Sequence, residues 1–134
     1  MQLTVTTNYA IRIILYLAET RCVTPAGEIS AGTKIAKKSL LATANKLKKA
    51  KLITGHMGVS GGYSLARAPE KITLLEIMEV TEGNAKISPC LEPGADCPWE
   101  LVKGCPLRNF YSGVQEELDS RFAGMTIGEL MEKG

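Results

Sequence analysis

Apolar residues recur at the spacing of an α-helix over the first twenty residues of the chain. Between Thr6 and Thr20 they form two stripes, one of Ala10, Ile13, Ile14 and Leu17 and the other of Ile11, Leu15 and Ala18. Residues three and four positions apart share a face of a helix. A helix that is apolar on two faces has two neighbours, so we expect elements to pack on both.

Two shorter helices are predicted next. We expect Thr24 to cap the first, which has Pro25 in its first turn, where the missing N–H costs nothing, and which ends near Gly32. The second runs over residues 37–50, with Leu40, Ala44 and Leu47 facing inward. Two helices joined in this way form a helix-turn-helix pattern.

A β-hairpin is predicted after the second of these helices. Residues 52–56 and 63–65 have the composition of short strands, and the glycines of residues 57–62 permit positive φ at the tip. The order of elements predicts a winged helix-turn-helix fold, mainly α with a small β-hairpin. In that geometry the second helix of the pair enters the major groove of DNA, and the wing lies along the backbone or the minor groove.

Three more helices are predicted in the second half of the chain. Capping boxes at residues 73–76 and 126–129 open a helix that stops at Gly83 and a short final helix. Between them lies a helix of about four turns whose apolar seam needs a partner. The residues of this seam are Leu107, Phe110, Tyr111, Val114, Leu118 and Phe122.

Residues 84–104 lack a helix or strand period. Prolines and glycines are frequent there, which predicts an irregular loop with at most one short helix, at residues 98–102. A long loop without a pattern usually has a function. We therefore divide the chain into a winged helix-turn-helix domain, residues 1–68, and a second part, residues 69–134, with the loop and dimerisation helices.

Charge is distributed unevenly between the two halves. Residues 1–67 carry ten Lys and Arg against two Glu, a balance of +8, whereas residues 68–134 carry six against twelve acids, a balance of −6. Residues 34–51 include seven lysines and neither Asp nor Glu. So concentrated a positive field predicts a nucleic-acid partner, although lysine-rich helices are also common as merely solvated surfaces.

Length and composition exclude several classes of protein. The 134 residues, 45% of them hydrophobic, suit one compact unit or two small ones sharing a core rather than a large enzyme. The apolar run at residues 13–18 is too short to span a membrane, and we expect a soluble cytoplasmic protein without a signal peptide. Phosphate-binding and nucleophile motifs are absent from the sequence, so we do not expect an enzyme.

Three of the four cysteines, Cys90, Cys97 and Cys105, lie on or next to the irregular loop, and each adjoins a proline. If Pro98 and Pro106 stand in first helical turns, Cys97 and Cys105 lie at helix N-termini, where the helix dipole favours the thiolate. Thiolates bind zinc and iron–sulfur clusters, so we expect a metal or cluster site in preference to plain thiols.

A zinc or iron–sulfur site requires about four ligands, and the loop supplies three. Cys22 is a candidate only if the fold brings it close, and we expect it instead to be a small buried hydrophobe. His56 is placed better for a phosphate contact than for a metal. Trp99 could shield a cluster from water, although a lone Trp more often just packs.

Several segments of the chain form a combination that is specific only when they are taken together. They are Leu3-Thr4 with Tyr9-Ala10, residues 45–53, the wing at residues 58–67, Ile72-Thr73, Glu82-Gly83 and the three-cysteine loop. Together they resemble the IscR/NsrR/CymR family of bacterial winged-helix regulators. The resemblance covers nearly the whole chain. It implies a homodimeric DNA-binding repressor or activator. Its cysteine-bearing branch implies an iron–sulfur cluster, 2Fe–2S or 4Fe–4S, that senses cluster supply, iron, nitric oxide or redox state.

The chain departs from the family at the fourth ligand. Arg108 stands where IscR-like members have a ligating histidine, and Asn8 stands where NsrR-like members have an acidic residue from the partner subunit. A fourth ligand could come from Asn8, Glu92, Asp96, Glu100, a water or a small thiol. A cluster incompletely ligated by protein would be more labile.

The surface expected to read DNA also differs from that of the family. Leu41 and Ala42 stand in the recognition helix where relatives have polar groups, and Met57 stands at the position of the wing arginine. The operator sequence therefore cannot be inferred from the operators of relatives. We expect a homodimer, paired through residues 107–122 with the first helix against the same interface, on a near-palindromic duplex. The predicted DNA contacts are Lys37, Lys38, Ser39, Thr43, Lys46, His56 and Ser60.

Two other functions stay open on the sequence. One is a cluster-free regulator of the same fold, responding through its thiols or through an effector bound by the acidic half. The other is a small iron–sulfur electron carrier, which the charge division and the wing disfavour.

Overall fold

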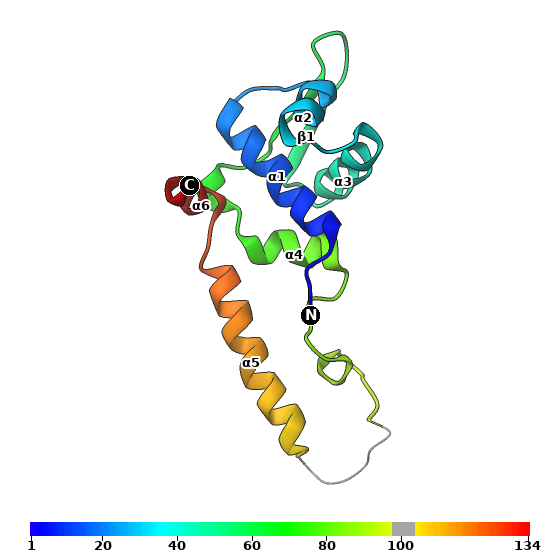
Figure 1. The fold of residues 1–134 in the computed structure, drawn as a ribbon, viewed down its shortest axis with the longest axis vertical. Helices are drawn as coiled ribbons and strands as arrows, with labels where there is room; N and C mark the ends of the chain where they lie inside the picture. The colour runs from blue at the N-terminus through cyan, green and yellow to red at the C-terminus, as the bar shows by residue number, and fades with distance from the viewer. Residues whose placement is uncertain (98–103) are drawn as a thin grey trace.

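The computed structural model describes residues 1–97 and 104–134 and confirms the winged helix-turn-helix fold, mainly helical with one antiparallel hairpin (Figure 1). Its α-helices are α1 (Val5–Thr20), α2 (Ala26–Thr33), α3 (Lys37–Lys49), α4 (Leu74–Glu82), α5 (Pro106–Ala123) and α6 (Ile127–Lys133). The strands are β1 (Ile53–His56) and β2 (Gly62–Leu65), and short 3-10 helices occur at η1 (Pro69–Lys71) and η2 (Pro89–Leu91). No helix in this part of the chain is long and apolar enough to cross a membrane.

Helix α1 is the centre of the core. The Thr4 hydroxyl caps it by accepting a hydrogen bond from the Thr7 N–H at 3.3 Å. Its first apolar stripe is fully buried, and it contacts α2, α3, α4, α6 and β2. The predicted two-sided packing is confirmed, because Ala18 of the second stripe is also buried and Ile11 and Leu15 pack against the core.

Helices α2 and α3 form the predicted helix-turn-helix. The inward stripe of α3, Leu40, Ala44 and Leu47, is fully buried, which pins one face of α3 to the core. The predicted cap by Thr24 is wrong: Pro25 occupies the N-cap position of α2, without a side-chain cap. Thr24 is instead paired with Tyr63 of β2 by two backbone hydrogen bonds of 2.8 and 2.9 Å.

The hairpin pairs β1 with β2 in antiparallel register, from Ile53 opposite Leu65 to His56 opposite Gly62. Gly62 is required at the base of this wing, because a Cβ there would lie 2.1 Å from the Thr24 carbonyl oxygen. Lacking a side chain, Gly62 lets the wing sit directly against the segment before α2.

The N-caps predicted for both capping boxes are confirmed. Thr73 accepts a hydrogen bond from the Glu76 N–H at 3.2 Å, and Thr126 accepts one from the Glu129 N–H at 3.1 Å. Ile127, at the start of α6, is fully buried in the same core cluster as α1. The last helix therefore returns to the winged-helix body, where Figure 1 shows it beside η1.

Helix α5 extends away from this body (Figure 1), and the part of the cysteine loop that forms η2 contacts it. Its 18 residues make about five turns, one more than the four predicted, and its start at Pro106 agrees with the prediction. Gln115 is the one buried residue that α5 contributes. The sequence pattern did not predict η2 within the loop, and the short helix predicted at residues 98–102 lies outside the described residues.

Candidate functional site

The outward side of α3 is a lysine-rich surface. Lys37 and Lys38 occupy its first turn, which contains no acidic residue, and Lys46, Lys48 and Lys49 occupy its last. All five are exposed. The N-cap residue Ala36 makes no side-chain hydrogen bond, so no cap side chain occupies the N–H groups of the first turn, in which Lys37 and Lys38 stand. This arrangement suits phosphate oxygens.

The prediction that Thr43 reaches DNA does not agree with its position. Thr43 is 3% exposed, and its hydroxyl donates to the Ser39 carbonyl at 2.9 Å. It lies on the inward stripe, three residues from Leu40, and that spacing was the sequence signal that it would be buried. Ser39 itself is half-buried.

Residues that the prediction left out share the outward face of α3 with Lys38. Leu41 is 42% exposed, and Ala42 and Asn45 are exposed as well. Their spacing of three, four and seven residues from Lys38 is the signal that could have identified them.

The wing presents a different surface from α3. His56 and Ser60 are exposed as predicted, and the His56 Nε2 atom lies 2.8 Å from the Ser64 hydroxyl across the hairpin. Met57 and Val59 are fully exposed at the tip. The wing tip therefore carries two apolar side chains and a hydrogen-bonded imidazole but no cation of its own.

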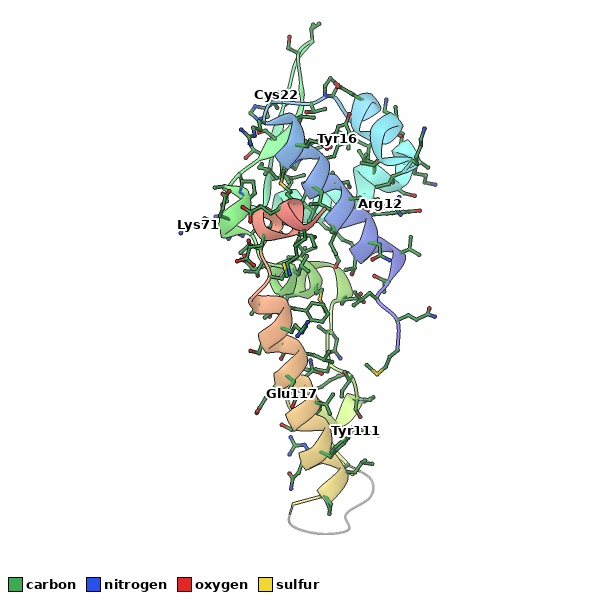
Figure 2. The ribbon with its side chains drawn as sticks, turned by 60° about the vertical axis from the view of Figure 1, so that its left-hand side comes forward. Arg12, Tyr16, Cys22, Lys71, Tyr111 and Glu117 are labelled. Carbon is green, nitrogen blue, oxygen red and sulfur yellow. The ribbon has the colours of Figure 1, made fainter. Side chains whose placement is uncertain are left out.

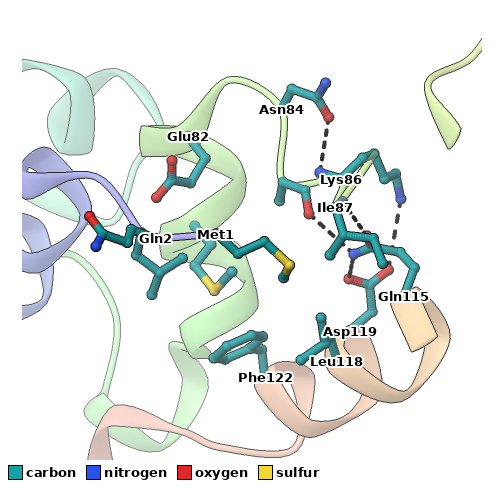
Figure 3. A pocket seen from close by; sticks show the side chains of 13 residues that line it. Met1, Gln2, Glu82, Asn84, Lys86, Ile87, Gln115, Leu118, Asp119 and Phe122 are labelled. Atoms are coloured by element: carbon teal, nitrogen blue, oxygen red, sulfur yellow. Dashed lines mark hydrogen bonds and ion pairs between the residues drawn. The ribbon is translucent and has the colours of Figure 1, made fainter. Parts of the chain in front are cut away.

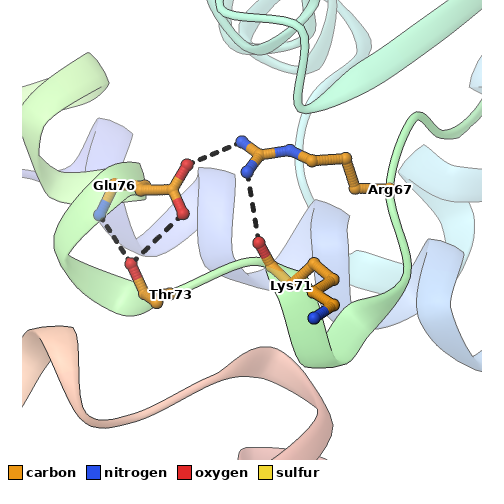
Figure 4. A network of polar contacts seen from close by, with 4 residues as sticks. All are labelled: Arg67, Lys71, Thr73 and Glu76. Carbon is orange, nitrogen blue, oxygen red and sulfur yellow. Dashed lines mark hydrogen bonds and ion pairs between the residues drawn. The ribbon is translucent and has the colours of Figure 1, made fainter.

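An ion-pair network connects the end of the wing to α4 (Figure 4). Arg67 places Nη2 at 2.6 Å from the Glu76 carboxylate and donates through Nη1 to the Lys71 carbonyl at 3.1 Å. Glu76 is also the N3 residue of the capping box opened by Thr73. The wing is thus fixed to the first turn of the helix that leads to the cysteine loop.

Two of the three loop cysteines lie on adjacent elements. Cys90 is in η2, with Sγ at 3.2 Å from the Ser88 hydroxyl, and Cys105 is the N-cap residue of α5, as predicted. Arg108 ties the two elements together by donating from Nε to the Cys90 carbonyl at 3.1 Å. Cys97 is exposed next to the part of the chain that is not described.

The donor types fit a zinc ion or an iron–sulfur cluster, because three thiols on or beside one loop are the ligands that both prefer. Their geometry is open: within residues 1–97 and 104–134 no three His, Cys, Asp or Glu side chains are close enough to hold a metal ion. Binding would have to draw the loop together around the group.

The candidate fourth ligands are scattered. Asn8 is exposed on α1, Asp96 is exposed on the loop, and the Glu92 carboxylate accepts a hydrogen bond from the Asn84 amide. Glu100 and Trp99 lie outside the described residues. Cys22 is exposed at the winged-helix end of the molecule, so the expectation of a buried small hydrophobe is wrong (Figure 2).

The start of the loop is fastened to α5 by Gln115 (Figure 3). The Gln115 amide oxygen accepts from the Ile87 N–H at 2.8 Å, and its NH2 group donates to the Ala85 carbonyl at 3.1 Å and to Asp119 at 2.8 Å. Lys86 lies 3.8 Å from the same Asp119 carboxylate. The loop is therefore attached to α5 at its start and, through Arg108, at Cys90.

The predicted seam of α5 remains largely open to solvent in the single chain. Phe110 is 67% exposed and Leu107 is 48% exposed, although both are apolar. The remaining seam residues, Tyr111, Val114, Leu118 and Phe122, are half-buried. Several large apolar side chains along one exposed helix mark an interaction surface.

Comparison with known proteins places the chain among transcription regulators. The family model described as Rrf2, iron-dependent transcriptional regulator, matches residues 3–133. The HTH-type transcriptional regulator NsrR of Shouchella clausii is 33% identical over 96 residues, which span 67% of this chain and 62% of that protein.

Two solved structures share the fold. IscR from T. potens superposes with a TM-score of 0.77 at 18% identity, over 99% of this chain and 88% of the other. CymR (YrzC), the global cysteine regulator of B. subtilis, gives 0.73 at 24% identity, over 100% and 98% of the two chains. At these identities the likeness concerns the fold alone.

Proposed function

The chain belongs to the Rrf2 family of transcriptional regulators, and we propose that it is a homodimeric DNA-binding sensor with an iron–sulfur cluster held by Cys90, Cys97 and Cys105. One observation carries the DNA-binding part of this proposal: the outward side of α3 carries five exposed lysines and no acidic residue, while its inward side is buried in the core. A transcription regulator needs no catalytic site, and the sequence contains none of the phosphate-binding or nucleophile motifs that would suggest one.

The DNA contacts divide by chemistry. Lys37 and Lys38 approach the duplex with the N-terminus of α3, while Lys46 and Lys49 on the same helix add charge that sets affinity more than sequence. Ser39 is half-buried next to them, and His56 and Ser60 supply the wing contact. Two such modules around a two-fold axis demand a near-palindromic site with half-sites about one helical turn apart, or a multiple of it.

Pairing of α5 helices would create this two-fold axis. The open seam from Leu107 to Phe122 includes exposed apolar side chains, and burying it against its own copy would remove them from water. Helix α1 packs against α4, which contacts α5, so the same interface reaches the winged-helix body.

The loop supplies the ligands. Cys90, Cys97 and Cys105 would hold the cluster, with an oxygen donor such as Asn8 of the partner subunit, Glu92, Asp96 or Glu100, or a small exogenous ligand, in the fourth position. A bound cluster supplies chemistry that iron status, nitric oxide or oxygen can alter. Gln115 and Arg108 attach the loop to α5. A change in the conformation of the loop would therefore change the position of α5.

This attachment is the basis of regulation in our proposal. If the loop closes on a cluster and moves α5, the distance between the two α3 helices of the dimer changes with it. A change of that kind alters affinity for a site with fixed half-site spacing.

The proposal is tested with protein purified anaerobically. Iron and sulfide are quantified, the visible spectrum is recorded, and binding to promoter DNA is measured before and after exposure to nitric oxide or oxygen. We expect colour, and affinities for the two forms that differ at least about tenfold, or about 1.4 kcal/mol. Equal affinities would remove the sensing function but leave DNA binding intact.

The second candidate is a cluster-free regulator that responds through its thiols or an effector. The open arrangement of the described cysteines favours it, and a colourless anaerobic preparation without iron would establish it over the cluster sensor. The electron carrier would be revived only if the protein showed no salt-dependent affinity for DNA.

A further inference from the structure

We propose that α3 recognises thymine through the C5-methyl group, with Leu41 and Ala42 as the specificity-determining residues and Asn45 reading adenine beside them. The inference rests on the proposed function, since it requires α3 to lie in the major groove. It adds the class of base pair that the helix selects.

The face that would meet the bases has an apolar patch at its centre. Leu41 and Ala42 lie three and four residues after Lys38, and Asn45 lies four and three residues after them, so all four share one side of the helix. Leu40 on the opposite side is fully buried, whereas Leu41 is 42% exposed. The core is therefore packed without Leu41, and its side chain is available to a ligand.

Base-edge chemistry restricts what such a patch can read. In the major groove each base pair presents hydrogen-bonding groups, and thymine alone adds a methyl group. Leu41 and Ala42 have no side-chain donor or acceptor, so the C5-methyl is the base feature that they can contact favourably. Asn45 can make two hydrogen bonds to N6 and N7 of adenine. All three residues thus favour A·T pairs.

The residues missing from α3 support the same conclusion. The helix contains no Asp or Glu to accept a hydrogen bond from the cytosine amino group, and it contains no Arg, so among its charged residues only a lysine could contact guanine. Its polar residues on the outward side are otherwise lysines, which bind phosphate and bring the apolar patch against the duplex. A single exposed Leu on a protein is ordinary, but here it lies inside the basic surface of the recognition helix.

The experiment begins with a random pool of about 30-base-pair duplexes, from which the full-length protein selects a preferred site. Each thymine of that site is then replaced by uracil, which keeps every hydrogen-bonding group and loses only the methyl. We expect affinity to fall about fourfold for each methyl group in contact, at matching positions of the two half-sites. Replacement outside the half-sites should have no effect.

Variants identify the residue that makes the contact. In Leu41→Ala the affinity for the thymine duplex should fall while that for the uracil duplex stays the same, so the two changes are coupled. Asn45→Ala and Lys38→Ala serve as matched controls on the same face. Both should weaken binding to the thymine and uracil duplexes by equal factors.

Two results would overturn the inference. If thymine and uracil duplexes bind equally, or if the losses from Leu41→Ala and from uracil multiply independently, the methyl contact does not exist although the protein still binds DNA. If no duplex binds at low ionic strength, the proposed function fails and takes the inference with it. Circular dichroism of each variant confirms that folding is unchanged, as expected for an exposed residue.

Discussion

The side chain of Gln115 takes the place of a backbone partner for Ile87, accepting its N–H at 2.8 Å from the buried side of α5. The same amide group donates to the Ala85 carbonyl. A loop without regular structure cannot satisfy its own backbone groups, so a glutamine from a neighbouring helix does this for it.

Replacing Gln115 with leucine should therefore release the start of the loop from α5. Shape is nearly preserved, but the Ile87 N–H and Ala85 carbonyl lose their partners, and we expect the free energy of unfolding to fall by about 1–3 kcal/mol. Urea denaturation measures this loss, and amide hydrogen exchange should show faster exchange at Ile87.

The matched control is Glu117→Ala, an exposed residue on the same helix (Figure 2). It should change stability by no more than about 0.5 kcal/mol. Unchanged protection of the Ile87 N–H in the Gln115 variant would mean that the loop is held by something else.

Local signals were sufficient for most of the fold. The threonines at positions 73 and 126 each precede a glutamate by three residues, and both cap helices as that spacing predicts. The inward stripe of α3 and the helical conformation of residues 107–122 likewise follow from the 3.6-residue period.

Long-range pairing accounts for what the sequence could not predict. Threonine is a residue type that often caps helices, so Thr24 is a reasonable candidate on the local sequence. Its backbone is instead paired with Tyr63, which is distant in the chain. Gln115 sits in an apolar seam, and only the loop that lies against it explains its burial. Thr43 differs from these two, because its spacing of three residues from Leu40 is a local signal that places it on the inward stripe of α3.

The lysines of α3 should contribute to DNA affinity through counterion release. Each of Lys38→Ala and Lys46→Ala is expected to weaken binding to all duplexes alike and to reduce the slope of log K against log salt by about 1. Fluorescence anisotropy at several salt concentrations measures both quantities.

Lys71→Ala provides the control, since Lys71 is also exposed but belongs to η1, outside α3 and the wing. Its salt slope should match that of the unaltered protein. If the salt slope of Lys71→Ala is reduced as much as that of the α3 variants, the lysines contribute through the electrostatic field of the whole molecule and not through direct contacts of α3 with DNA.

Replacing individual cysteines should separate those that bind the cluster from one that does not. We expect Cys90→Ser and Cys105→Ser to lose most of the iron and sulfide of anaerobically purified protein, because serine is a poor substitute for a thiolate ligand. Cys22→Ser should retain them, since Cys22 lies at the other end of the molecule. Iron analysis and the visible spectrum measure the cluster content of each variant. Equal iron content in all three variants would contradict a cluster site formed by the three loop cysteines.

The apolar seam of α5 should determine the oligomeric state. Phe110 is 67% exposed in the single chain, so a charged residue there costs the monomer little, but Phe110→Glu would place carboxylates in an interface between two copies. We expect the variant to dissociate by at least a hundredfold in Kd, measured by analytical ultracentrifugation, and to lose affinity for a palindromic site. Glu116→Gln, on the exposed side of the same helix, should remain dimeric. A Phe110→Glu protein that stays dimeric would place the two-fold contact on another surface, and the half-site spacing would then have to be derived from that surface instead.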